Sequence, residues 1–266
     1  MLKVDNLKKY FPVERGVFRR VIDYVRAVDG ISFEIKKGEV FALVGESGCG
    51  KTTTAKLIVG LFEPTDGKIF FHGKDISLLK RKELARKIQI IFQDPFASLN
   101  PRLTIGTIVG EAVKHRLEAT DEKVKNKKIK KETRELLNRV GLPVNILNEY
   151  PHQFSGGQRQ RIGIARALAM QPELIVADEP VSSLDISVQA QILNLLLDLR
   201  DSLELSYLLI AHDLNVVRFL ADRVAVMYQG KIVERGSVRN VYEDPLHPYT
   251  KKLLEAIPTL ETETIK

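Results

Sequence analysis

The stretch GESGCGKT, from Gly45 to Thr52, decides the fold. It fits the pattern G-x-x-x-x-G-K-S/T, in which glycines let successive backbone N–H groups turn inward around phosphate oxygens. The apolar run Val40–Val44 before it is typical of a buried strand, and Lys51–Val59 after it predicts a helix whose positive N-terminal end faces the anion. This order of strand, loop and helix predicts an α/β fold with a phosphate-binding loop, or P-loop.

Each residue of this loop has an expected place around a bound nucleotide. Lys51 would reach the outer phosphates, and the Thr52 hydroxyl would hold Mg²⁺. The residues expected to surround the phosphates are Gly45, Glu46, Ser47, Gly48, Cys49, Gly50, Lys51, Thr52 and Thr53. The alternative is an ordinary glycine-rich turn, which rarely matches the whole pattern by chance.

A second apolar run ends in two carboxylates. Leu174–Ala177 is followed by Asp178 and Glu179, and acidic residues at a strand end are what metal-assisted phosphoryl transfer needs. We expect Asp178 to steady Mg²⁺ through water and Glu179 to polarise the attacking water. The alternative is that these residues only cap the next helix.

Three more patterns follow in a fixed order. Gln93 comes after the run Ile88–Phe92, FSGGQ at Phe154–Gln158 comes before a helical pattern, and His212 comes after the run Tyr207–Ala211. Together with the P-loop and the paired carboxylates, they make the chain resemble an ATP-binding subunit of an ABC transporter over residues 7–235. The resemblance implies an α/β, RecA-like P-loop ATPase core with an antiparallel β-subdomain and an inserted helical subdomain.

The resemblance also implies roles for these residues. Gln93 would bind Mg²⁺ and report the nucleotide state to membrane subunits. His212 would contact the γ-phosphate and orient Glu179 or the water, and the sequence leaves open whether Glu179 or His212 is the formal base. The residues implied to act at a second subunit's ATP or across the dimer interface are Ser155, Gly156, Gly157, Gln158 and Asp185. We therefore expect a nucleotide-driven dimer.

The aromatic residue that stacks on adenine is harder to choose. The resemblance nominates Tyr10, while Phe11 and Phe18 stay open, and Tyr10 packing under the β-layer is an equal alternative. The segment Pro12–Tyr24 reads as a basic, turn-rich insertion.

Cys49 is the one cysteine of the chain, so neither an intramolecular disulfide nor a cysteine-held cluster is expected. A small residue tolerated in the loop is the simplest interpretation. Its position beside Lys51 at a helix N-terminus nevertheless predicts a stabilised thiolate.

Composition is typical of a folded enzyme. The 266 residues are 44% hydrophobic and 28% charged, no apolar run approaches a membrane span, and the N-terminus lacks a signal-peptide core. Much of the net charge of +7 lies in Lys114–Arg134, which we interpret as a solvated face. This run has no interleaved aromatic residue, so we do not expect nucleic acid as a partner.

The patterns suggest one nucleotide-binding domain over residues 1–266. Its expected parts are a core with the β-subdomain (1–95 and 171–235), a helical subdomain (96–170) and a C-terminal extension (236–266). Short strands are expected in 1–40 and 66–73, with turns at Lys37-Gly38 and Asp66-Gly67. Helices are expected at Thr104–Arg116, Glu132–Val140, Gln158–Met170 and Ile186–Leu203, and a hairpin at Arg223–Arg235.

Two stretches point to a subfamily. IIFQDPFASLNPR at Ile90–Arg102 and EDPLHPYTKKLLEAIP at Glu243–Pro258 are similar to ATPase subunits of dipeptide, oligopeptide and nickel importers. This resemblance implies import of peptides, or of oligosaccharides or nickel, and a permease helix that docks around Phe96–Pro101. The alternative is that Phe96 and Leu99 are ordinary core residues. No iron–sulfur cluster is expected in this chain.

The implied partners are two permease subunits, a second and non-identical ATPase subunit, and indirectly an extracytoplasmic solute-binding protein. A homodimer stays possible for the isolated chain, and the expected location is the cytoplasmic face of the membrane, held through the permeases. The alternative function is a soluble ABC-type ATPase that acts as a regulator or with nucleic acid. A small-molecule P-loop kinase is disfavoured, because kinase chemistry does not explain FSGGQ.

Overall fold

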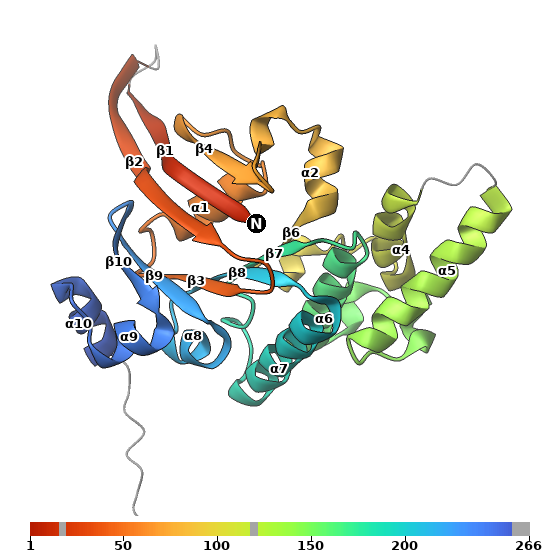
Figure 1. The fold of residues 1–266 in the computed structure, drawn as a ribbon. Coiled ribbons are helices and arrows are strands. Elements are labelled where there is room, and N and C mark those ends of the chain that lie inside the picture. Colours follow the sequence, from red (N-terminus) through yellow and green to blue (C-terminus); the bar gives the residue numbers. More distant parts are fainter. Residues whose placement is uncertain (16–19, 118–121, 257–266) are drawn as a thin grey trace, which may run out of the picture.

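The computed structural model describes residues 1–15, 20–117 and 122–256 of the chain. The strands form two sheets, and most helices lie on the side of the larger sheet that faces away from the smaller one (Figure 1). The larger, six-stranded sheet has the order β10-β9-β3-β8-β7-β6, and the smaller one has the order β2-β1-β4-β5.

The six-stranded sheet carries the sequence patterns described above. Its strands are β3 (Val40–Val44), β6 (Ile88–Ile91), β7 (Leu174–Asp178), β8 (Ser206–Ala211), β9 (Arg223–Tyr228) and β10 (Lys231–Ser237). All are parallel to their neighbours except β10, which pairs antiparallel with β9. Every residue of β3, β7 and β8 is buried, because helices or the second sheet cover both faces, so these strands are continuous apolar runs.

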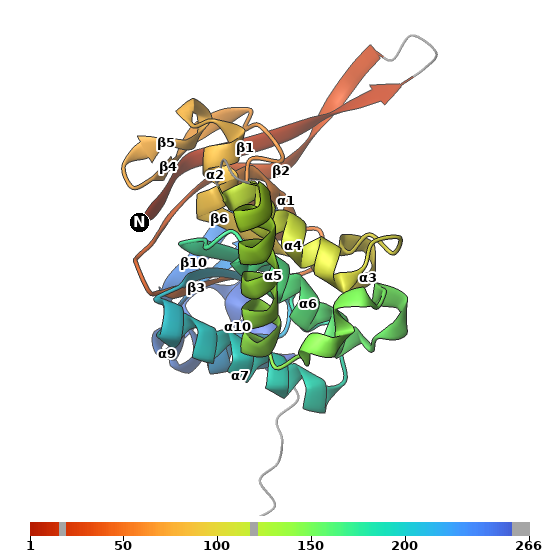
Figure 2. The same ribbon diagram turned by 90° about the vertical axis from the view of Figure 1, so that its right-hand side faces the viewer.

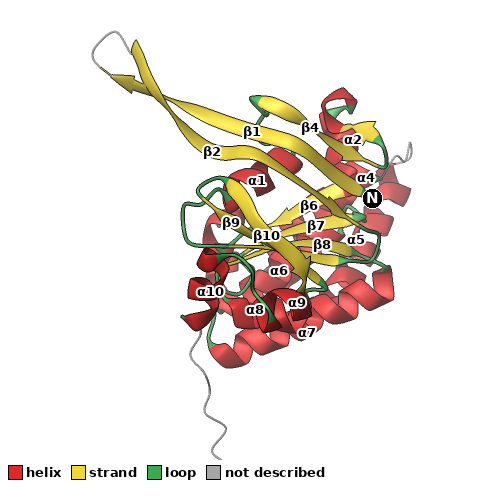
Figure 3. Cartoon of the chain, turned by 60° about the vertical axis from the view of Figure 1, so that its left-hand side comes forward, coloured by secondary structure: helices red, strands yellow, loops and turns green. Residues whose placement is uncertain are grey.

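This topology collects the candidate functional residues. The P-loop, Gln93, Glu179 and His212 each follow the carboxyl end of a strand. Since parallel strands end at the same edge of a sheet, these loops meet there. Helix α1 (Lys51–Ile58) continues from the P-loop and lies between the two sheets (Figure 3).

The antiparallel sheet contains β1 (Leu2–Arg15), β2 (Arg20–Ile35), β4 (Asp66–Phe71) and β5 (Lys74–Asp75). The expectation of short strands was wrong for β1 and β2. The turn-rich interpretation of Pro12–Tyr24 was wrong for residues 12–15 and 20–24, and the rest of that segment lies outside the described residues. Residues 12–15 and 20–24 continue the two strands beyond the rest of the sheet, with Phe11 opposite Val25 and Pro12 opposite Tyr24 (Figure 2). β-branched and aromatic residues in such cross-strand pairs favour strand over turn.

The expected turn at Asp66-Gly67 lies within a strand instead. Both residues begin β4, where the pairing with β1 shifts register between Asp5 and Lys8. Gly67 has a φ of 83°, and a Cβ there would lie 2.2 Å from the carbonyl oxygen of Asn6. The glycine therefore permits a β-bulge rather than a chain reversal.

The helical lobe consists of α3 (Pro95–Ser98), α4 (Ile105–Arg116), α5 (Glu122–Arg139) and α6 (Gly156–Leu168). Helix α5 begins ten residues before the predicted start at Glu132. The prediction missed its first half, because apolar periodicity appears only in the second half. Its first half is rich in lysine, a good helix former, and is largely exposed, which agrees with the predicted solvated face. One hydrophobic core cluster runs from this lobe to the six-stranded sheet.

The remaining elements belong to the six-stranded sheet or pack around it. Helix α7 (Ile186–Leu203) and the β9–β10 hairpin, turned at Gln229-Gly230, confirm the predictions for these segments. The structure adds α2 (Arg81–Lys87) and α8 (Leu214–Leu220), and after β10 the short helices α9 (Val238–Glu243) and α10 (Pro248–Glu255). Helix α10 lies near the β9–β10 side of the sheet (Figure 1).

Candidate nucleotide-binding site

The P-loop connects β3 to α1 and is closely packed at both ends. A Cβ at Gly45 would lie 2.2 Å from the carbonyl oxygen of Met227, and one at Gly50 would lie 2.1 Å from that of Ala27. Gly50 also has a φ of 112°, which side-chain-bearing residues avoid. The first and last glycines of the pattern are therefore required by packing against β9 and β2.

Lys51 is 4% exposed and points back over the loop. Its ammonium nitrogen donates to the carbonyl oxygens of Gly45, at 2.7 Å, and Glu46, at 2.9 Å. A buried ammonium whose closest oxygen partners are neutral carbonyls is well suited to a phosphate, which supplies full negative charge.

Asp178 lies beside the first turn of α1. It is 4% exposed, and its carboxylate accepts a 3.2 Å hydrogen bond from the Thr52 hydroxyl. Burial raises the pKa of Asp178, while the Thr52 hydrogen bond opposes that change. A cation bound next to this carboxylate would favour its charged form, as expected for a metal-binding position.

Oxygen donors fit a magnesium ion here. The Thr52 hydroxyl and the Asp178 carboxylate are hydrogen-bonded to each other. Gln93 can offer its amide oxygen to the ion, because its hydrogen bond to Glu179 uses the amide nitrogen. Among the described residues, no three His, Cys, Asp or Glu side chains gather into a metal cluster. This agrees with Mg²⁺, which typically takes one or two protein carboxylates and fills its other positions with water and phosphate.

Glu179 is the centre of a second group of side chains. Its Oε2 accepts from Nε2 of Gln93 at 2.8 Å, and the same oxygen lies 3.1 Å from Nδ1 of His212. Glu179 has a φ of 48°, in the left-handed region that glutamate rarely adopts, and its own N–H donates to the Ile210 carbonyl. A strained backbone held by its neighbours is often found at functional sites.

These residues line a cleft of about 410 Å³. Its predicted members are Ser47, Gly48, Gly50, Lys51, Thr52, Thr53, Gln93, Glu179 and His212. Ala27 lines it as well and was not predicted, since nothing in its local sequence shows that the middle of β2 meets Gly50. Gly45, Glu46 and Cys49 belong to the loop without lining the cleft.

Tyr10 does not line the cleft. Its hydroxyl donates to Asp29 at 2.6 Å, and the guanidinium of Arg26 lies 5.7 Å from its ring centroid. Phe11 packs edge-on against Phe62, which follows α1, with ring centroids 5.6 Å apart. Phe18 lies outside the described residues, and the adenine-stacking residue stays a prediction.

The signature residues begin α6 and also lie outside the cleft. The Ser155 hydroxyl accepts from the Gln158 N–H, and the Gln158 side chain accepts from the Ser155 N–H, so the two residues form a capping box. Gly157 packs so closely on Val188 that a Cβ would lie 2.3 Å from its side chain. The role of Ser155, Gly156, Gly157, Gln158 and Asp185 at another subunit's nucleotide stays a prediction.

The predicted thiolate at Cys49 is wrong. The residue is 8% exposed, and burial raises the pKa of its thiol, although Lys51 lies 3.7 Å from the sulfur and acts in the opposite direction. Desolvation therefore outweighs the nearby charge.

The two residues considered for the predicted permease-docking surface differ in exposure. Phe96 is 62% exposed, with the Arg159 guanidinium 3.5 Å from its ring centroid, whereas Leu99 is 2% exposed. The core alternative is correct for Leu99 and wrong for Phe96.

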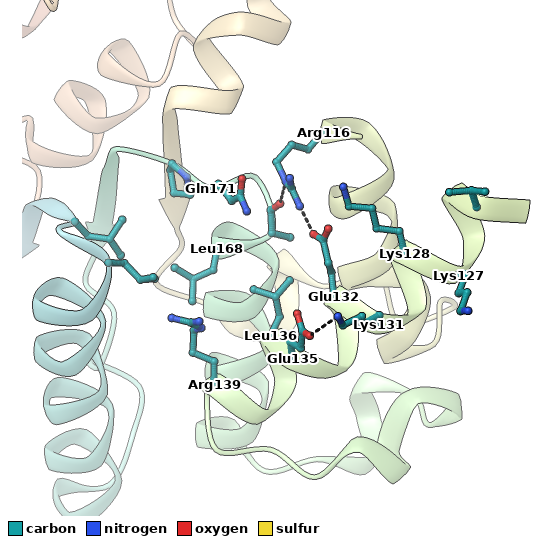
Figure 4. Close-up of a pocket in the computed structure, with 15 residues that line it drawn as sticks. Arg116, Lys127, Lys128, Lys131, Glu132, Glu135, Leu136, Arg139, Leu168 and Gln171 are labelled. Carbon is teal, nitrogen blue, oxygen red and sulfur yellow. Dashed lines mark hydrogen bonds and ion pairs between the residues drawn. The ribbon is translucent and has the colours of Figure 1, made fainter. Parts of the chain in front are cut away.

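A larger hollow of about 960 Å³ lies elsewhere, between α5 and the ends of α6 and α7 (Figure 4). Lys127, Lys128 and Arg139 give it positive charge, while Arg116 is paired with Glu132. It contains none of the predicted site residues, so size alone does not identify the nucleotide site.

The comparisons with known proteins agree with this geometry. A sequence model of the family described as "ABC transporter" matches residues 28–182, which are more than half of the chain. The chain belongs to the ABC transporter family. A second model, "Oligopeptide/dipeptide transporter, C-terminal region", matches residues 233–266.

Individual relatives are similar over nearly the whole chain. The oligopeptide transport ATP-binding protein AppF of Bacillus subtilis is 51% identical over 97% of this chain and 78% of its own length. The dipeptide transport ATP-binding protein DppF of Haemophilus influenzae is 46% identical over 98% of this chain and 79% of its own length. These matches support the predicted subfamily of ABC proteins.

Solved structures show the same fold in another ABC protein. The ATP-binding cassette MJ0796, solved as a dimer in a post-hydrolysis state with ADP and Pi, has a TM-score of 0.75 and 30% identity, over 90% of this chain and 99% of that one. The RecA-like core with its antiparallel β-subdomain and helical lobe is therefore confirmed. No helix among the described residues of the present ABC protein is long and apolar enough to cross a bilayer.

Proposed function

We propose that this ABC protein hydrolyses ATP to drive the import of oligopeptides or dipeptides through partner permeases. The observation that carries the proposal is the cleft at the carboxyl edge of the sheet that Lys51, Thr52 and Glu179 line, with the Asp178 carboxylate bonded to the Thr52 hydroxyl. The peptide class is supported by the names of the relatives and by the match of the C-terminal segment.

The P-loop and Lys51 would bind the phosphates. Backbone N–H groups from Ser47 to Thr53 would surround the β- and γ-phosphates, and the Lys51 ammonium would exchange its two carbonyl partners for phosphate oxygens. Thr52, Asp178 and Gln93 would hold Mg²⁺, which when bound neutralises charge on the phosphates.

Glu179 would position the water that attacks the γ-phosphate. Gln93 and His212 both reach the same carboxylate oxygen, which fixes its orientation and leaves the other oxygen for water. His212 is exposed at the cleft and would contact the γ-phosphate from its position directly after the carboxyl end of β8. Positioned charge of this kind, rather than covalent chemistry, accounts for most phosphoryl-transfer catalysis.

Each complete site would need two subunits. The signature residues at the start of α6 lie outside the cleft of their own subunit, where the N-terminal end of the helix can face an anion on a partner. MJ0796 is dimeric, which supports a dimer for this ABC protein. In the cell we expect a second, non-identical ATPase subunit, two permeases and an indirect solute-binding partner.

Contact with the permeases would place the protein at the cytoplasmic face of the membrane. The exposed ring of Phe96 lies three residues after Gln93, so a permease helix against Phe96 would sense the nucleotide through Gln93. Peptide transport would then follow closing and opening of the dimer.

Purification of the tagged full chain from its source membrane tests this function. We expect two permeases, a second ATPase and a peptide-loaded binding protein to co-purify under Mg-ATP with the Glu179→Gln change, which slows hydrolysis. Recovery without any membrane protein would contradict the transport function and favour a soluble regulator. A binding protein loaded with sugar or nickel would contradict the peptide class alone.

A further inference from the structure

The chain after β10 reaches back to the P-loop. The N–H of Glu46, the second residue of the loop, donates a 3.0 Å hydrogen bond to the hydroxyl of Tyr249, 203 residues later in the sequence. Tyr249 belongs to the first turn of α10. The P-loop is thus connected to helix α10, which does not line the cleft.

This contact holds a peptide group that Lys51 also uses. In the peptide group between Gly45 and Glu46, the Gly45 carbonyl accepts from the Lys51 ammonium at 2.7 Å, while the Glu46 N–H donates to the Tyr249 hydroxyl. When Lys51 turns to a phosphate, the carbonyl loses this partner and the Tyr249 bond is unaffected. The tyrosine therefore restrains the entry of the loop in both positions of Lys51.

Tyr249 itself is fixed from several sides. Its ring lies 4.3 Å, centroid to centroid, from that of Tyr228 at the end of β9, the strand against which Gly45 packs. The Glu234 carboxylate accepts from the N–H groups of Leu246, at 2.8 Å, and His247, at 2.9 Å. The ring contact and the anchored start of α10 fix the Tyr249 hydroxyl, so this hydroxyl can position the Glu46 N–H.

The protonation states support these contacts. Burial raises the pKa of Tyr249, so the phenol is uncharged at neutral pH. For Glu234, burial acts to raise the pKa, but hydrogen bonds, beginning with the Leu246 N–H, hold it below its usual range. Glu234, which anchors the start of α10, is therefore ionised near neutral pH, and Tyr249 is uncharged.

We propose that Tyr249 is a positioning residue of the ATP site, which orders the P-loop before nucleotide binds. The inference rests on the proposed ATP site and adds a function for the C-terminal segment. Because the Tyr249 hydroxyl lies behind the loop rather than in the cleft, its contribution is to nucleotide affinity. Equal stabilisation of bound substrate and transition state changes KM and leaves kcat unchanged.

The test compares two tyrosine-to-phenylalanine changes in the full chain. Tyr249→Phe removes the bond to Glu46 and keeps the ring against Tyr228. Tyr242→Phe, in the neighbouring helix α9, removes a 2.6 Å bond to the Leu214 carbonyl, and neither Tyr242 nor Leu214 lines the nucleotide cleft. Both variants lose one tyrosine hydroxyl bonded to a backbone group, so Tyr242→Phe controls for general loss of stability.

For Tyr249→Phe we expect KM for ATP and Kd for ADP, the latter by titration calorimetry, to rise about five-fold, as for one hydrogen bond. Its kcat should stay within about two-fold of wild type, and Tyr242→Phe should keep wild-type KM and Kd. Unchanged constants in Tyr249→Phe, or equal shifts in both variants, would overturn the proposal. A wild-type chain without turnover would contradict the ATPase function, while the ADP titration would still decide the role of Tyr249.

Discussion

The side-chain nitrogen of Gln93 donates a 2.8 Å hydrogen bond to Oε2 of Glu179. The two residues follow β6 and β7, which are neighbours in the six-stranded sheet. The bond therefore connects the segment that continues to the exposed Phe96 with the carboxylate proposed to position water. A movement of Gln93 would change the orientation of Glu179.

Gln93→Ala should lower kcat by about 10-fold or more, because neighbours that orient a catalytic or metal-binding group typically contribute this much. Steady-state phosphate release at saturating Mg-ATP measures the effect. Gln89→Ala is the matched control, since Gln89 lies on β6 and its side chain bonds the Ala85 carbonyl, away from Glu179. Equal kcat values for Gln93→Ala and wild type would show that the hydrogen bond does not matter for turnover.

Cys49 should react slowly with iodoacetamide at pH 7. Burial penalises the thiolate and raises the pKa of the thiol, so the reactive fraction is below that of free cysteine and should grow about tenfold per pH unit until the raised pKa is reached. Rates measured from pH 7 to 10, with the urea-unfolded chain as reference, check the sign. A folded chain that reacts faster than the unfolded one at pH 7 would restore the thiolate interpretation.

Phe11→Ala should raise KM for ATP by about 10-fold, the scale of one aromatic stack on a base. Phe11 packs against Phe62, four residues after the end of α1, whereas the Arg26 guanidinium lies 5.7 Å from the ring centroid of Tyr10 and the Tyr10 hydroxyl is bonded to Asp29. Tyr10→Ala, measured in the same assay, should change KM less. The opposite order would identify Tyr10 as the adenine-stacking residue.

Substitutions of Phe96 and Leu99 should have different effects, one on coupling to the permease and the other on folding stability. Leu99→Ala removes a buried side chain and should lower the free energy of unfolding by about 2–4 kcal/mol. Phe96→Ala removes a largely exposed ring and its contact with Arg159, so it should lower the free energy of unfolding by only about 1 kcal/mol, while transport by the assembled complex falls. Normal transport by Phe96→Ala would exclude its ring from the permease contact.

The sequence predicted best those parts whose signal is local. Strands β3, β7 and β8 are continuous apolar runs, and the P-loop, Asp178, Glu179 and His212 each follow such a run directly. The start of helix α5 was predicted too late in the chain, because lysines confer helix propensity without apolar periodicity.

Contacts between distant segments left no such signal. The bond from Glu46 to Tyr249 and the approach of Ala27 to Gly50 join residues far apart in the chain, and neither pair has a pattern of its own. The raised pKa of Cys49 depends on burial in the folded loop, which the charge of Lys51 alone did not reveal.

The most direct test of the proposed catalytic site is ATP turnover by purified wild type and Glu179→Gln, with ATP binding measured on the same samples. Loss of the carboxylate should lower kcat by about 10²-fold or more, because it removes the group that positions water. ATP affinity should be retained, since Lys51 and the P-loop are intact. Wild-type turnover in Glu179→Gln, or no ATP binding by either protein, would contradict ATP hydrolysis at this cleft with Glu179 as the residue that positions water.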